Sequence, residues 1–291
     1  NVGIGVNSLG ALTTGACNTA IGDDSVASGV VTGNYNTALG NSSMDALTSG
    51  TLNVAVGRLA LGSNTTDSNN TAVGTSALEA NTTGQYNTVM GSVAGSQSTG
   101  ELNTLLGYAV GATSTALTTG DSNTIVGALC DTTASGSSKA MGLGYSLDCA
   151  AGYTTLGDGS SDIRAAHGNV TWATVSDQRY KKDIVDSTAG LSFINALQPR
   201  TFKYKTLGEL PETFSAYEAD STEVFKNSNT NHGFIAQEVK AAIDADSSIA
   251  DGFKLWDDRE DGSQEVAEAA LIPILVKAIQ ELTARIETLE G

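Results

Sequence analysis

The sequence predicts two parts, a repetitive β-shaft and, after it, an α+β domain that ends in a helix. Three observations support this. A five-residue pattern recurs through residues 1–128, and apolar residues at heptad spacing occupy the end of the chain. The composition changes at residue 176, because all six Phe and all three Pro come after it. The predicted domains are therefore a repeat shaft at 1–128, a β-rich neck at 129–175 and a C-terminal domain at 176–291.

The repeat is Asn-X-apolar-apolar-Gly, and successive Asn residues are 18, 17, 17, 17, 16 and 20 positions apart. A further Gly precedes most of these Asn residues by three positions. Asn1-Val-Gly-Ile-Gly5 matches the end of an earlier copy, so we expect the chain to be a fragment of something longer. The repeats begin at Asn18, Asn36, Asn53, Asn70, Asn87, Asn103 and Asn123.

Self-similarity at a fixed period indicates a repeat architecture. β-branched residues between Gly and Asn predict short strands and tight turns, with φ > 0 supplied by Gly and Asn. Each repeat should be one coil of a β-roll or β-helix, with its apolar triplet inward and its Asn and Thr in stacked ladders. A core of Ala, Val and Leu is thin, so association of several chains would enlarge it. The pattern resembles the head repeats of trimeric adhesins and the shafts of phage tail fibres, which implies a trimer.

Residues 129–175 keep some Gly but lose the period, and 168–175 alternate as a strand does. The three cysteines, Cys17, Cys130 and Cys149, lack metal-ligand spacing. We expect them to be small buried thiols.

The C-terminal domain has the composition of an ordinary α+β fold. We predict a helix over 189–197, a strand over 200–205 and a long irregular loop over 206–230. A strand that runs into a helix is expected over 232–239, and a turn-rich stretch over 251–262.

The chain ends in a narrow heptad seam, which predicts a helix and a coiled coil. The alternative is an amphipathic helix packed on its own domain. Ile and Leu at the two core positions favour two strands, whereas the repeats suggest three chains, and we follow the repeats. Pro273 falls near the start, where a first helical turn accepts it. The seam residues are Ile272, Leu275, Ile279, Leu282, Ile286 and Leu289.

Charge and hydropathy exclude some functions. The formal net charge is −17, with three Lys/Arg against eleven Asp/Glu before residue 176. We predict no nucleic-acid partner, because phosphate binding needs basic side chains. No segment reaches the roughly 18 apolar residues of a membrane span, so no membrane insertion is expected. A glycan-degrading shaft lacks support, since aromatic residues are scarce there and no carboxylate pair stands out.

The boundary itself carries candidate chemistry in Ser176-Asp-Gln-Arg-Tyr-Lys181. A Ser hydroxyl can attack the carbonyl before it through a five-membered ring, giving an ester that water hydrolyses. Such a Ser needs a base, and Lys181 serves if burial or a cation such as Arg179 or Lys182 lowers its pKa. The competing interpretation is a helix N-cap in a solvated turn.

Four motifs in order carry a family resemblance: Ser176-Asp-Gln-Arg-Tyr-Lys181 with Ile184, Leu197-Gln-Pro-Arg-Thr-Phe-Lys-Tyr204, Gly233-Phe-Ile-Ala-Gln-Glu238 and Leu271-Ile-Pro-Ile-Leu-Val-Lys-Ala-Ile-Gln-Glu-Leu282. Together they resemble the intramolecular chaperone auto-processing domain of endosialidases and phage tail fibres. That resemblance spans 176–291 and implies a self-cleaving Ser–Lys peptidase that helps three copies of the preceding β-structure to assemble.

The resemblance also implies a site. The scissile bond would be Val175–Ser176, with Ser176 as nucleophile and Lys181 as its partner. Asp177, Arg179, His232 and Glu238 are candidate site-lining residues, and no cofactor or metal is expected.

The implied protein is a homotrimeric fibre or spike of a virion that folds in the host cytoplasm. Its partners would be upstream fibre or tail proteins and a candidate receptor on the host surface. The alternative function is a trimeric adhesin or fibre whose C-terminal domain is structural and never cuts.

Overall fold

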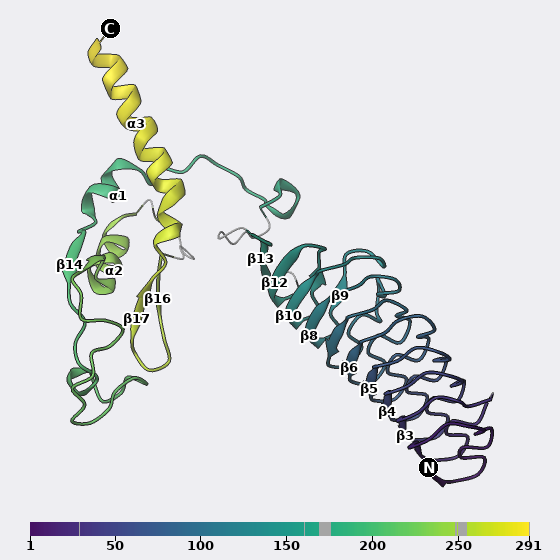
Figure 1. Ribbon diagram of the computed structural model, residues 1–291. Helices are drawn as coiled ribbons and strands as arrows, with labels where there is room; N and C mark the ends of the chain where they lie inside the picture. The colour runs from purple at the N-terminus through teal and green to yellow at the C-terminus, as the bar shows by residue number, and fades with distance from the viewer. Residues whose placement is uncertain (29, 160, 169–175, 248, 250–254, 291) are drawn as a thin grey trace. The chain divides into compact units, whose positions relative to one another are not determined.

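A computed structural model describes residues 1–28, 30–159, 161–168, 176–247, 249 and 255–290. The chain forms two compact units, Asn1–Tyr180 and Lys181–Gly291. Figure 1 shows a stack of coils in the first unit and a mixture of helices and short strands in the second. Each unit is described by itself below.

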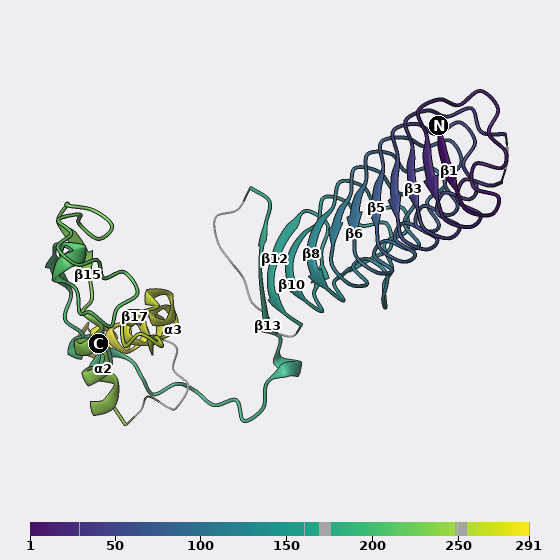
Figure 2. The ribbon, with the colours of Figure 1, turned by 90° about the horizontal axis from the view of Figure 1, so that it is seen from below.

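The first unit is a β-solenoid, the name used here for the coils and closing strand of residues 1–166. Each coil contributes one short strand to a sheet in which neighbouring strands are parallel and in register (Figure 2). The strands in sheet order are β1 (Val2–Ile4), β2 (Thr19–Ile21), β3 (Thr37–Leu39), β4 (Val54–Val56), β5 (Thr71–Val73), β6 (Thr88–Met90), β7 (Thr104–Leu106), β8 (Thr124–Ala128), β10 (Met141–Tyr145), β12 (Tyr153–Asp158) and β13 (Ser161–Ala166).

The parallel stack continues past residue 128. Strand β10 pairs in parallel with both β8 and β12, although the sequence period has faded there. Strand β13 then turns back and pairs antiparallel with β12. The series of parallel coils therefore ends at β12, and β13 forms the C-terminal edge of the sheet. A second parallel pair, β9 (Asp131–Thr132) with β11 (Asp148–Cys149), lies in the same coils.

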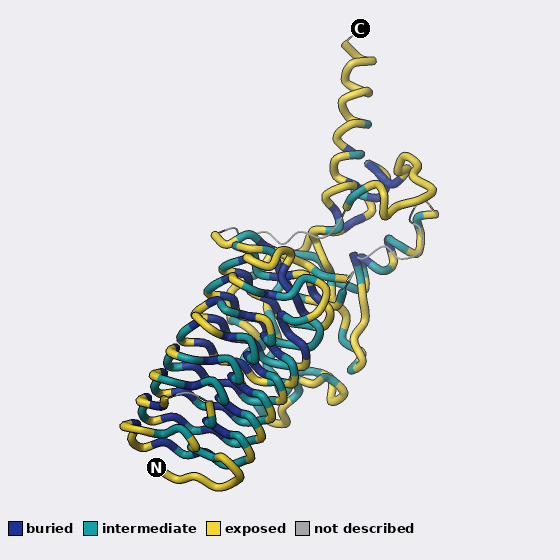
Figure 3. The backbone as a smooth tube through the Cα atoms, turned by 90° about the vertical axis from the view of Figure 1, so that its right-hand side faces the viewer, coloured by how far each residue is buried: buried dark blue, intermediate teal, exposed yellow. Residues whose placement is uncertain are grey.

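The solenoid core is lined by the central residue of each apolar triplet. These residues are fully buried, while the residues on either side of them are half-buried or exposed (Figure 3). The prediction that the whole triplet points inward was therefore wrong, because successive strand residues face opposite sides of a sheet. The buried column consists of Ala20, Ala38, Ala55, Ala72, Val89, Leu105 and Ile125.

This core is closed within one chain. Larger side chains from the turns, including Met44, Leu47, Leu61 and Leu78, pack against the small residues of the column and are fully buried. Alternation of large and small groups fills the interior at the density that cores require. Burial of the solenoid core thus needs no second chain.

The predicted Asn ladder is confirmed. Each of the seven repeat Asn residues is almost fully buried, and its side-chain oxygen accepts the backbone N–H of the next ladder residue, as from Asn53 to Asn36 at 3.0 Å. Its side-chain amide donates to a carbonyl of the following coil, as from Asn53 to Asp67 at 2.8 Å. The ladder runs from Asn1 through the seven repeat Asn residues and ends where Asn123 accepts from Ala140.

Threonine also forms a ladder, but at a different position in the coil. The hydroxyls of Thr48, Thr83 and Thr99 donate to backbone carbonyls of the next coil at 3.0–3.1 Å. The residue that follows each ladder Asn, Thr in all but Val2 and Val54, instead begins the strand and lies on its outer side.

The backbone conformation explains why Gly ends each apolar triplet. It also differs from the prediction that the ladder Asn supplies φ > 0. The Gly that ends the triplet has φ between +126° and +142° in the repeats, and a Cβ at Gly57 would lie 2.5 Å from the carbonyl oxygen of Gly74. The ladder Asn residues themselves do not adopt φ > 0. The residue before each repeat Asn does, with φ of 58–63° from Tyr35 to Leu102, and the turns hold further left-handed residues such as Leu59 and Leu61.

The second unit is a small α+β fold. Its core gathers Phe193, Leu197, Val239, Leu255 and Ile274 from segments far apart in the sequence. The elements are α1 (Leu191–Ala196), β14 (Arg200–Phe202), β15 (Asn231–Gly233), α2 (Ala236–Ala245), β16 (Trp256–Asp258), β17 (Gln264–Val266) and α3 (Ile272–Glu290), with 3₁₀ turns at Gln178–Tyr180 in the first unit and at Leu207–Glu209 and Glu268–Leu271 in the second.

Most predicted elements of this unit are present. The stretch expected to be turn-rich, 251–262, also contributes β16 to a hairpin with β17. The expected strand over 168–175 falls almost wholly outside the described residues. Cys130 and Cys149 are buried, as predicted, whereas the prediction for Cys17 was wrong, since it is exposed on a turn. Among the described helices, none has both the length and the apolarity needed to cross a bilayer.

The ladder predicts a large effect of one amide. In Asn70→Ala, the buried Asn87 N–H loses its acceptor, at about 1–3 kcal/mol for an unpaired group, while the Gly84 carbonyl keeps a second donor in the Asn81 amide. We expect the free energy of unfolding to fall by about 2 kcal/mol, measured by denaturation followed by circular dichroism. The exposed Asn41→Ala is the control, and an equal loss in both variants would contradict a special role for the ladder.

A buried carboxylate predicts a pH effect. Asp67 stands where most repeats have Gly, is 7% exposed, and its Oδ2 has no hydrogen-bond partner among the described residues. Burial raises the pKa of Asp67. A raised folded-state pKa means that stability falls as pH rises through that pKa.

Asp67→Asn should therefore be more stable than the parent at pH 7. The parent should gain stability relative to Asp67→Asn as the pH falls from 7 toward about 4, the ordinary pKa of an Asp, in thermal melts at several pH values. Glu101→Gln removes an exposed carboxylate and is the charge-matched control. Parallel pH profiles for all three proteins would refute the prediction.

Candidate functional site

The segment that begins at Ser176 is largely exposed. The side chains of Tyr180, Ile184 and Val185 are 79%, 62% and 85% exposed, and Ser176 and Lys181 are exposed as well. Only from Ala189 onward does the chain enter the core of the second unit. The motif thus lies on an exposed, irregular segment, where water can reach its side chains.

Within this segment, Asp177 organises a turn. Its Oδ1 accepts the backbone N–H of Arg179 at 2.8 Å, and its carbonyl accepts that of Tyr180 at 3.1 Å. The Arg179 guanidinium also forms a bidentate pair with the same carboxylate, with Nη2 2.6 Å from Oδ2. These bonds lower the pKa of Asp177 and raise that of Arg179. The two residues therefore have a local structural role, and the charge of Arg179 is offset by its neighbour.

The proposed dyad stays a prediction. Ser176 belongs to the first compact unit and Lys181 is the first residue of the second. Val175, the other side of the expected scissile bond, lies outside the described residues.

The second and third motifs meet in the folded unit. Strand β14 pairs with β15, so that Arg200 lies opposite Gly233 and Thr201 opposite His232. Across this pair, the Arg200 guanidinium binds the Glu238 carboxylate with bonds of 2.8 and 2.9 Å, and the pairing lowers the pKa of Glu238. Glu238 is therefore held by Arg200, and His232 is exposed on the neighbouring strand.

Sequence reasoning missed this pair. Arg200 lies in the second motif and Glu238 in the third. Their opposite charges were the one feature of the sequence that could have indicated an ion pair. The pairing itself depends on a strand register that spans more than 30 residues of chain.

The fourth motif supports the first helix. Glu281 of α3 accepts the backbone N–H of Leu191 at 2.9 Å, at the start of α1. Its carboxylate fills the space beside Gly190, where a Cβ would lie 2.6 Å from Oε1. The N-cap residue of α1 has no side chain of its own, so an acidic group from α3 takes its place.

The heptad seam of α3 is not packed on its own unit. Ile274 and Ala278 are the buried residues of this helix, and they lie on a different face. The predicted apolar seam is therefore exposed along the surface of α3. The exposed fractions are 60% for Ile272, 41% for Leu275, 61% for Ile279, 43% for Leu282, 53% for Ile286 and 86% for Leu289.

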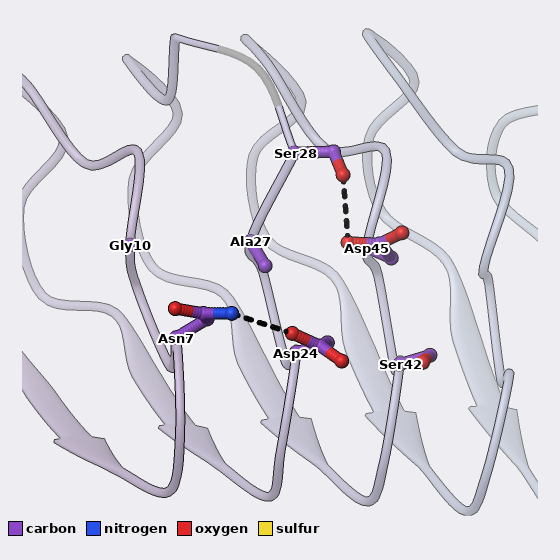
Figure 4. A pocket seen from close by; sticks show the side chains of 7 residues that line it. All are labelled: Asn7, Gly10, Asp24, Ala27, Ser28, Ser42 and Asp45. Atoms are coloured by element: carbon purple, nitrogen blue, oxygen red, sulfur yellow. Dashed lines mark hydrogen bonds between the residues drawn. The ribbon is translucent and has the colours of Figure 1, made fainter.

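A pocket of about 340 Å³ lies on the side of the first coils (Figure 4). Its carboxylates are bound within the solenoid, since Asp24 accepts from Asn7 and Asp45 from Ser28 at 3.0 and 2.9 Å. Across the described residues, no group of three or more His, Cys, Asp or Glu side chains is arranged to hold a metal ion. The thiol of Cys149 is buried, and burial raises its pKa to about 12, which makes it unreactive at neutral pH.

Comparison with known families gives one match. Residues 176–246 match the model of a peptidase family described as chaperone of endosialidase. The matched segment starts at Ser176 and contains three of the four motifs. The family consists of self-cleaving chaperone domains, and a match to it after a β-solenoid fits a tail fibre with a C-terminal chaperone domain. No curated protein and no solved structure matched the chain.

The Glu281 contact predicts a local loss of stability. In Glu281→Ala, the first turn of α1 loses its acceptor, at a cost of about 1 kcal/mol, typical of a lost N-cap. We expect faster hydrogen exchange in Leu191–Ala196 and a lower melting temperature of the second unit. Glu287→Ala, on an exposed position of the same helix, should leave both unchanged, and matching effects would argue against a capping role.

Proposed function

We propose that this chain is part of a homotrimeric viral fibre or spike, in which the C-terminal domain helps the β-solenoid to fold and assemble and then cleaves itself off between Val175 and Ser176. One observation carries the proposal: the match to self-cleaving chaperones starts at the motif Ser, after the last strand of the solenoid. Cleavage would release residues 176–291, with Ser176 as the first residue of the free chaperone domain.

The proposed step is an acyl shift. Ser176 Oγ attacks the carbonyl carbon of Val175, and Lys181 accepts the hydroxyl proton. The C–N bond of the peptide then breaks, the proton passes to the Ser176 nitrogen, and an ester joins Val175 to Ser176 Oγ. Water hydrolyses the ester to the Val175 carboxylate and the free hydroxyl. The exposure of this segment supports the access of water in the second half.

Assembly would use the seam of α3. Its apolar side chains are exposed along the helix in a single chain, as expected of a coiled-coil strand that lacks its partners. Upstream fibre or tail proteins and a host-surface receptor are the proposed partners, and folding would take place in the host cytoplasm.

A structural trimerisation domain that does not cut is the second candidate. The observation that favours it is the turn at Asp177, whose carboxylate both caps the turn and neutralises Arg179. This is the arrangement of a solvated cap, which needs no catalytic purpose.

A denaturing gel separates the two candidates. Cleavage predicts fragments of 175 and 116 residues from the parent chain of 291. Ser176→Ala and Lys181→Ala should remain as one intact band, because each removes a partner of the acyl shift. Ser187→Ala, on an exposed neighbour in the same segment, should still cleave. If the parent chain stays intact in a sample where the trimer is shown to form, the proposed self-cleavage is wrong.

The seam of α3 predicts an assembly defect. Ile279→Asp places a charge on the seam without disturbing the core of its own unit, because Ile279 is 61% exposed. In the uncleaved Ser176→Ala chain, we expect it to lower the mass from trimer toward monomer in light scattering and to reduce the soluble yield several-fold. Gln280→Asp, exposed beside the seam, is the control. A trimer retained in full by Ile279→Asp would contradict this use of the helix.

A further inference from the structure

The outer face of the solenoid sheet carries two columns that run along the parallel strands. In strands β2 to β8 and β10, the first and third residues face outward and are half-buried or exposed, while the residue between them is buried. In β12 the outward residues are Thr154 and Leu156, on either side of buried Thr155. The third residues pair in register from strand to strand, so their side chains form a continuous line. That line is entirely apolar: Ile4, Ile21, Leu39, Val56, Val73, Met90, Leu106, Val126, Leu143 and Leu156.

The neighbouring column is also uncharged. It consists of Thr in most strands, with Val2, Val54 and Met141 in the others. The left-handed position before each ladder Asn flanks it and holds further apolar groups, with Tyr35 and Tyr86 61% and 55% exposed. Monomeric proteins rarely expose an apolar surface of this extent, so the face indicates a partner.

Charge decides where an identical chain can approach. The first 175 residues carry eleven acidic and only three basic side chains, so two copies repel one another over most of their surface. Those charges include Asp24, Asp45 and Glu79, which lie on the turns, and none stands in the two columns. The strand face is therefore a surface where copies meet without opposing like charges.

Dimensions and repeat also favour a second copy. At about 4.8 Å between strands and 3.3 Å per residue, the face is roughly 45 Å long and 15 Å wide. This corresponds to on the order of 700 Å² for each copy, close to the roughly 800 Å² that one partner gives to a standard interface. A partner must also present apolar groups at the spacing of the coils, which the same solenoid does.

We propose that this strand face is the surface through which copies of this chain pack against one another, side by side and in the same direction, with the apolar column turned toward the common axis. The core of each solenoid is complete in one chain, so this contact joins folded coils. The inference deepens the proposed function, because it names the surface by which the fibre chains associate.

Cross-linking of the full chain tests the surface. In a Cys17→Ser background, which removes the exposed native thiol, Thr88→Cys places a reporter on β6 and Gln97→Cys places one on a turn of the same coil. Both parent residues are exposed. With a short bismaleimide, we expect several-fold more cross-linked chains from Thr88→Cys than from Gln97→Cys. Thr71→Cys on β5 is a second reporter that should behave as Thr88→Cys does.

A charge on the face provides the matched perturbation. Met90→Asp, added to the Thr88→Cys chain, should reduce cross-linking several-fold, while Gln97→Asp should leave it unchanged, with circular dichroism to show that the coils remain folded. Oligomers by light scattering with equal cross-linking at both reporters would overturn the inference and leave the proposed function standing. A monomer by light scattering would overturn the proposed assembly and this surface together.

Discussion

The buried asparagine ladder is the interaction on which the rest of the solenoid depends. An amide carries two donors and an acceptor, and burying it without partners costs several kcal/mol. Here each amide satisfies one N–H of the next ladder residue and one carbonyl of the following coil. This arrangement works only when consecutive Asn residues stack, so the ladder fixes the period. The repeat of 20 residues keeps the Asn stack because its extra residues form a turn beside the stack. In that turn, the backbone N–H groups of Thr113 and Thr115 donate to the buried carboxylate of Asp131.

The same constraint explains a backbone that looks strained in isolation. Tyr35, Leu52 and Tyr86 adopt left-handed φ values, which cost an L residue roughly 1–2 kcal/mol. They persist because the neighbouring Asn, held on both sides, leaves the chain one way to enter the strand. The larger apolar residues of the coils occupy the interior and the outer strand face, and some, such as Val6 and Tyr108, are exposed on the turns.

The C-terminal unit is organised by contacts between motifs that are distant in sequence. Glu238 binds Arg200, and Glu281 supports the start of α1. Three of the four motifs therefore build the scaffold, while the first lies on an exposed segment whose Asp177 and Arg179 satisfy one another. The packed part thus holds the fold and the exposed seam of α3, while Ser176 and Lys181 lie on the accessible segment.

The sequence alone determined the coil, its period, the ladder, the fold class of the second unit and the seam of its last helix, because each is a local pattern repeated at the spacing of strands or helices. The proposed chemistry also comes from the sequence, because Ser176 and Lys181 are selected by residue type and by motif order. Tertiary structure decided what depends on facing and on distant pairing. It showed that only the central triplet residue enters the core, that the stack continues to β12, that 256–266 form a hairpin, and that Arg200 meets Glu238. Strand alternation and register set these contacts, and both depend on residues far away along the chain.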